Sequence, residues 1–182
     1  MKLKDIILQD AKARKPDYAD RLSIEEPGLE GLPKGLRHFS VKIQGLHSYL
    51  PINYVVVGES EIYSSLVEGD FVRLLHRLRL LEDNTLSAIE IAVLFMLLEY
   101  PNRELRIVET LEELALQVTD KDRETLAQVV QPAVCRRVDG GLECEFICSN
   151  VRTSALERFR LQISPEYELS GESEEVLYFG RH

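Results

Sequence analysis

Tryptophan is absent from this sequence of 182 residues, cysteine occurs three times, and no apolar run is long enough to span a bilayer. The opening stretch Met1–Leu8 is charged and its apolar run is short, so we expect no secretory leader. An odd number of cysteines is unlike the paired framework of a small secreted domain. These scarcities argue against a membrane-spanning protein and a disulfide scaffold, and they favour a cytoplasmic protein.

Basic residues are also scarce. The chain carries 22 lysines and arginines against 31 aspartates and glutamates, which gives a net charge of −9. The stretches 85–163 and 164–182 are both net acidic. Neutralisation of phosphates supplies much of the affinity of proteins that bind duplexes, so this charge disfavours nucleic acid as a partner. The apolar content of 45% is ordinary for a globular protein with a proper core.

Hydrophobic periodicity predicts a central helix from Thr85 to Tyr100. The helix is apolar nearly all round, which predicts that its neighbours bury it on several sides. Ser87 and Glu90 have the spacing of a capping box at its start, and Pro101 follows its end. We expect this helix to be the element around which the following segments pack.

The segments after the central helix predict a helix-turn-helix followed by a hairpin. Thr110 and Glu113 form a second capping-box pattern. After Pro132 the period changes to two, with a turn signal at Asp139–Gly141. The expected elements are a strand over 104–108, helices over about 111–118 and 121–131, a hairpin of strands over 134–138 and 142–148, and a third strand over 156–163.

This order resembles a winged helix-turn-helix domain, and three segments carry the likeness: LLEYPNREL, LEELALQVTDKDRETLAQVVQP and AVCRRVDGGLECEFI. A fainter likeness extends to the winged-helix part of the cullin-homology region, through Phe146–Asn150 after the wing and the strand Leu156–Ile163. Cullins carry a modified lysine beyond this strand, whereas no lysine here follows Lys121. The resemblance therefore implies a winged-helix fold and argues against a ubiquitin-ligase role.

The first half of the chain combines helical and strand-like patterns. Residues 1–21 have the spacing of an amphipathic helix that ends or kinks at Pro16. A loop rich in glycine and proline follows, and then two runs with a period of two predict a pair of strands within 39–57. Residues 59–81 are expected to be helical, with a break near Gly69.

Together these patterns predict an α+β protein in which a small N-terminal segment packs with a winged-helix-like domain. The expected parts are an N-terminal α+β segment over 1–84, a winged-helix-like domain over 85–163 and an acidic C-terminal tail over 164–182. The tail ends in an apolar run, so it either docks as a last strand or forms a disordered arm.

The leading functional hypothesis is a non-enzymatic protein-interaction or assembly module, with no cofactor, no metal and a protein partner, and with a homo-oligomer left open. The opening of the expected recognition helix, residues 120–124, is acidic, whereas base reading usually needs Arg, Lys, Asn or Gln. Arg136 and Arg137 are expected to pair across the hairpin with Glu143 and Glu145. The candidate interaction surface comprises Asp120, Lys121, Arg123, Glu124, Arg136, Arg137, Arg158 and Arg160.

Two alternatives stay open. In a DNA-binding regulator, a dimer would concentrate the arginines on one face, including Arg152. In a small-molecule or enzymatic role, His38 and His47 would line one pocket of the N-terminal half. The cysteines offer no third alternative, because metal sites need about four ligands and buried cysteines are common core residues. We therefore expect Cys135, Cys144 and Cys148 to be core residues.

Overall fold

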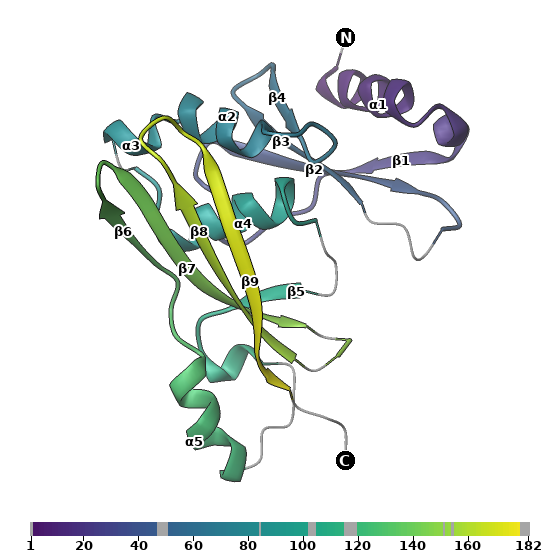
Figure 1. Ribbon diagram of the computed structural model, residues 1–182. Coiled ribbons are helices and arrows are strands. Elements are labelled where there is room, and N and C mark those ends of the chain that lie inside the picture. The colour runs from purple at the N-terminus through teal and green to yellow at the C-terminus, as the bar shows by residue number, and fades with distance from the viewer. Residues whose placement is uncertain are drawn as a thin grey trace. The chain divides into compact units, whose positions relative to one another are not determined.

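The computed structural model describes residues 2–46, 51–83, 85–101, 105–114, 120–150, 152–153 and 155–178, without the side chains of residues 120–122 and 178 (Figure 1). The chain forms two compact units. Unit 1 comprises Met1–Arg77 and Val93–Arg103, and unit 2 comprises Leu78–Ala92 and Glu104–His182. Each unit holds one antiparallel sheet, which confirms the predicted α+β class. The unit boundaries fall at residues other than 84 and 163, where the sequence placed them.

The sheet of unit 1 has four antiparallel strands in the order β1-β2-β3-β4. Their bounds are Leu22–Glu25 for β1, Leu36–Ile43 for β2, Ile52–Val57 for β3 and Glu61–Ser64 for β4. The central pair β2 and β3 is the predicted pair of strands. The helix predicted over 59–81 is wrong for its first part, because Gly58, at φ +62°, turns the chain back into β4. The helices begin later, with α2 at Asp70–Arg77 and α3 at Leu80–Asp83.

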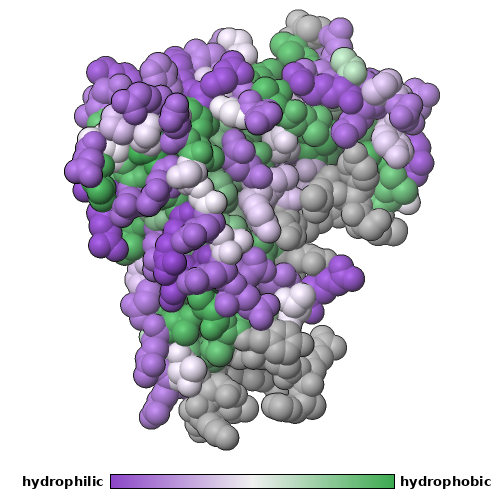
Figure 2. All heavy atoms as spheres, in the orientation of Figure 1, coloured by the Kyte–Doolittle hydropathy of each residue, from purple (hydrophilic) through white to green (hydrophobic). Residues whose placement is uncertain are grey.

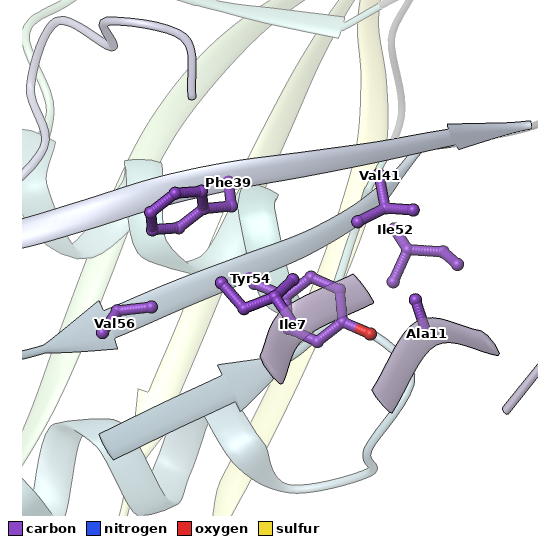
Figure 3. Close-up of a cluster of buried hydrophobic side chains, with 7 residues drawn as sticks. All are labelled: Ile7, Ala11, Phe39, Val41, Ile52, Tyr54 and Val56. Atoms are coloured by element: carbon purple, nitrogen blue, oxygen red, sulfur yellow. The ribbon is translucent and has the colours of Figure 1, made fainter. Parts of the chain in front are cut away.

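Helix α1 (Leu3–Arg14) packs on one face of this sheet. Its end is followed by Pro16, where the 3-10 helix η1 (Pro16–Arg21) begins, as the sequence predicts. Figure 3 shows side chains of α1, β2 and β3 directed into one cluster. Its members are Ile7, Ala11, Phe39, Val41, Ile52, Tyr54 and Val56. The Tyr54 hydroxyl donates a hydrogen bond of 2.9 Å to the Asp10 carboxylate at the rim of this cluster.

The central helix of the prediction is α4 (Ala88–Leu98), and the boundary between the two units falls inside it. From Ile91 to Leu98 every side chain but that of Met96 is buried, which confirms the predicted burial. The capping box is also confirmed, because the Ser87 N–H donates to the Glu90 carboxylate over 2.7 Å. Within the described part of the chain, no helix is both long enough and apolar enough to cross a membrane.

The sheet of unit 2 has five antiparallel strands, with the order β5-β7-β8-β9 and with β6 paired to β7. Their bounds are Leu105–Val108 for β5, Val134–Val138 for β6, Gly141–Asn150 for β7, Ala155–Ile163 for β8 and Leu169–Tyr178 for β9. The register confirms the predicted hairpin and third strand. The segment predicted as a tail contains β9, which pairs with β8 along its length. Strands β5 and β6 pair with different halves of β7.

The winged-helix assignment is not confirmed. Between β5 and β6 lie the 3-10 helix η2 (Leu111–Glu113) and helix α5 (Asp120–Val129). The first helix of the expected pair is described only at η2, because residues 115–119 lie outside the described ranges. At η2 the Thr110 N–H and the Glu113 carboxylate are 3.4 Å apart, as the second capping box requires. The tail docks as a last strand, one of its two expected outcomes, and this strand, β9, extends the sheet past β8.

The two faces of the unit 2 sheet differ. One face is a buried core in which Phe146 and Phe159 lie opposite each other, with their rings stacked 5.2 Å apart. Other buried members of this face are Leu142, Cys144, Cys148, Leu161 and Ile163. The opposite face is covered at its β5 end by η2 and α5. Leu126 of α5 packs on Ile147 and Leu156, together with Leu114, which follows η2, and Val130, which follows α5. Toward β6 this second face is polar, and we call that part the outer face.

Candidate interaction surface

Alternating charges cover the outer face. Arg160 contacts three carboxylates, those of Glu145 at 3.0 Å, Glu172 at 3.3 Å and Glu174 at 3.3 Å. Arg158 shares two of them, with contacts of 3.5 Å to Glu145 and 3.0 Å to Glu174. The five residues come from β7, β8 and β9, so pairing of three strands builds the network. With three carboxylates around two guanidinium groups, the network has a net negative charge.

Arg136 and Arg137 are neighbours on β6, so their side chains lie on opposite faces of the sheet. The Arg137 guanidinium donates a hydrogen bond of 3.3 Å to the carbonyl of Leu80. The predicted pairing with Glu145 is wrong, because that carboxylate binds the arginines of β8. Arg136 lies in register with Glu143, but in the described part of the chain no side chain bonds to its guanidinium.

The predicted residues of the recognition helix belong to α5. Arg123 forms an ion pair of 3.3 Å with Glu112, and Glu124 is exposed. The side chains of Asp120 and Lys121 lie outside the described atoms. Helix α5 packs at the β5 end of the unit 2 sheet, on the face opposite Phe146, and contributes Leu126 to the hydrophobic cluster there. Among the predicted site residues whose side chains the structure describes, Arg158 and Arg160 of β8 share one network, and the others lie outside it.

Two exposed valines on β6 were missed by the sequence reasoning. Val134 is 48% exposed and Val138 is 37% exposed, and both lie on the outer face on either side of Arg136. The sequence Val-Cys-Arg-Arg-Val contains a signal for them, because its alternation places the valines on the same face as a charged residue and not on the face of a core residue. Figure 2 shows that hydrophilic side chains predominate on the visible face, with hydrophobic ones in smaller groups.

Strand β6 is also an open edge, since its pairing partner is β7 and the described residues include no strand on its other side. Cys135 and Cys144 are directly opposed, with Cα atoms 4.1 Å apart, which is the spacing of a pair without mutual main-chain hydrogen bonds. The N–H and C=O groups of Cys135 and Arg137 therefore point away from β7. They are the main-chain groups that an additional strand would bind.

Cys135 and Cys144 form a disulfide across β6 and β7. The expectation of three unlinked core cysteines is wrong for this pair, although Cys144 and Cys148 are buried as expected. Cys135 lies four residues before Asp139 and Cys144 lies four residues after Gly140, so a two-residue turn at Asp139–Gly140 places the two cysteines opposite each other. This equal spacing could have predicted the pair. Burial raises the pKa of the Cys148 thiol, with a further contribution from Glu157, and this keeps the thiol protonated.

His38, a candidate of the N-terminal half, is buried on the face of the unit 1 sheet opposite α1. Its Nε2 lies 3.2 Å from Asn53 Oδ1, and the Asn53 amide in turn donates 3.1 Å to the carbonyl of Leu97. Burial lowers the pKa of His38, which favours the neutral ring. Because Asn53 Oδ1 is an acceptor, the tautomer that fits this contact carries its proton on Nε2. This chain of bonds joins β2, β3 and α4. His47, the other candidate, lies outside the described residues.

Comparisons with protein-family models, with curated proteins and with solved structures found no match to this chain.

Proposed function

We propose that this chain is a non-enzymatic protein-interaction module whose binding surface is β6 together with the adjoining outer face. The observation that carries this proposal is the pair of exposed valines, Val134 and Val138, on an open sheet edge. The exposed valine side chains offer an apolar contact to a partner, and the charge between them fixes the orientation in which the partner binds. Arg136 supplies that charge, and its guanidinium has no bond to a described side chain.

The charges of the outer face favour a protein over a nucleic acid. A phosphate contact would require Arg158 or Arg160 to leave carboxylates that already surround it. The remaining carboxylates would then repel the phosphate backbone. A DNA-binding regulator therefore ranks second, and it predicts steep loss of duplex affinity as salt rises. For the module we expect no measurable duplex binding at ~0.1 M salt, where screening acts over about 10 Å.

A charge reversal sharpens this distinction. In a DNA-binding regulator, the double variant Asp120→Lys/Glu124→Lys should bind labelled duplex more tightly than the wild type, because it adds positive charge at the start of α5. In a protein module, neither protein should bind, and the variant should lose at most about 1 kcal/mol of stability through its helix-dipole and capping contributions. Sub-micromolar, salt-sensitive binding of duplex by the wild type would put the regulator first.

The winged-helix scaffold is part of this proposal. It is supported by the order α4, β5, η2, α5, β6 and β7, and by the pairing of both β5 and β6 with β7. The cytoplasmic location stays a prediction, and the Cys135–Cys144 disulfide weighs against a reducing compartment.

Affinity capture from an extract of the native cell, quantified by mass spectrometry, tests the proposal. The double variant Val134→Ser/Val138→Ser should lose one or more proteins that the wild type captures. The matched control is Leu29→Ser, which changes a 39% exposed side chain of unit 1 instead of unit 2 and should capture the same proteins as the wild type. Identical capture by all three proteins would contradict a binding surface on β6.

A further inference from the structure

We infer that β6 binds an extended segment of a partner protein as an additional antiparallel strand, and that the segment carries an acidic residue between two apolar ones. This inference rests on the proposed function and specifies the partner's chemistry. Strand addition at a sheet edge derives its affinity from main-chain hydrogen bonds and its specificity from alternate side chains. Both contributions can be assigned to particular groups of β6.

The main-chain groups come first. Because Cys135 and Cys144 are a pair without mutual hydrogen bonds, the N–H and C=O groups of Cys135 and of Arg137 are directed outward. They provide two donors and two acceptors at the spacing of alternate residues, which an extended backbone matches. The disulfide joins Cys135 of β6 covalently to Cys144 of β7, so this strand is fixed to its neighbour before a partner arrives.

The side chains define the pattern that the edge recognises. Val134, Arg136 and Val138 share the outer face, and an added strand would place its own alternate side chains beside them. Apolar side chains would lie beside the two valines, and a carboxylate beside Arg136. The complementary segment therefore reads apolar-x-acidic-x-apolar, where x is a residue on the other face.

The other strand edges suit this segment less well. Strand β9 carries Glu172, Glu174 and Glu175, all exposed, which repel an acidic segment and protect that edge from pairing. Strands β1, β4 and β5 have four residues each, so they offer a shorter ladder. A second copy of this chain is also a poor occupant, because antiparallel pairing centred on β6 sets Arg136 opposite itself, and like charges directly opposed are destabilising.

The probe is a fluorescein-labelled peptide, Ser-Val-Ser-Glu-Ser-Val-Ser, with blocked ends, titrated with the oxidised protein of 182 residues and followed by anisotropy. We expect saturable binding that weakens about tenfold when the central Glu is replaced by Lys, or when the protein carries Arg136→Glu. Arg136→Lys should bind as the wild type does. The control is Arg106→Glu, at an exposed arginine of β5, which should leave binding unchanged.

A second peptide separates strand addition from simple charge attraction. Methylation of the main-chain nitrogens of the two serines beside Glu removes the donors that would face Cys135 and Arg137, without changing the peptide's charge. Strand addition predicts that this peptide no longer binds. Equal binding of both peptides, or no binding of the unmodified one, overturns strand addition. Failure of the proposed function has a different sign, which is that the Val134→Ser/Val138→Ser variant captures the same cellular proteins as the wild type.

Sedimentation of the free protein tests the competing occupant. A monomer, unchanged by Arg136→Glu, is the expected result. A dimer that dissociates in the Val134→Ser/Val138→Ser variant would show that a second copy occupies the edge, and it would overturn the assignment to a partner segment.

Discussion

Reduction of the Cys135–Cys144 disulfide should lower the free energy of unfolding of unit 2 by about 2.5 kcal/mol. The bond closes a loop with a sequence separation of 9, and loop-closure entropy for a loop of this length corresponds to about 2.5 kcal/mol. With a urea dependence of about 2 to 3 kcal/mol per molar, the unfolding midpoint should fall by about 1 M. Pulsed hydrogen exchange at increasing urea concentration, read on peptides from β6 to β9, reports unit 2 separately from unit 1.

The control for this prediction is the double variant Cys135→Ala/Cys144→Ala. Its midpoint should not respond to reductant, because Cys148 remains as a buried thiol in both conditions. If reductant shifts the variant as much as the wild type, the loss of stability does not come from this bond. If reductant shifts neither protein, the bond is absent or contributes nothing to unit 2, and the reasoning from loop closure is refuted.

Three further substitutions have defined outcomes in unit 1. His38→Gln should flatten the pH dependence of stability, measured by thermal unfolding. Because folding lowers the pKa of His38, the wild-type protein has its full stability above the unfolded pKa of about 6.5 and loses stability progressively as the pH falls below it. The control His76→Gln, at an exposed position, should still lose stability in this way. Asp70→Ala should cost about 2 kcal/mol in urea unfolding, because the buried carboxylate accepts from a main-chain N–H of β4, and an undiminished midpoint would contradict this. Tyr54→Phe should cost about 1 kcal/mol in the same assay by removing its bond to Asp10, and Asp10→Asn, which retains an acceptor, should cost less.

Local signals account for the parts of the fold that could be predicted. The capping boxes and the β6–β7 hairpin depend on residues close in sequence, and Asp139 and Gly140 adopt φ values of +49° and +84°, as a two-residue turn between strands requires. Strands β1 and β4 were missed because each has four residues and is held by pairing to a neighbouring strand. Spacing within so short a segment fits a helix as well as a strand, and the pairing decides.

The candidate site was predicted less well for a similar reason. The sequence identified Arg158 and Arg160 as charged residues on one face of a strand, but two of their three carboxylate partners come from β9. The register of β9 on β8 shifts between Leu156 and Glu157, and such a shift cannot be predicted from the spacing of residues in the sequence. An arginine that pairs across strands cannot be told from an arginine available to a ligand until the register is known.

Amide hydrogen exchange along β6, resolved by NMR in the free and peptide-bound protein, tests the open edge most directly. In the free protein, the amides of Cys135 and Arg137 should exchange faster than that of Arg136, which points toward β7. Bound Ser-Val-Ser-Glu-Ser-Val-Ser should slow the two outward amides and leave Arg136 unchanged. Protection of Cys135 and Arg137 already in the free protein, or fast exchange that persists while the peptide is bound, would contradict a binding edge at β6.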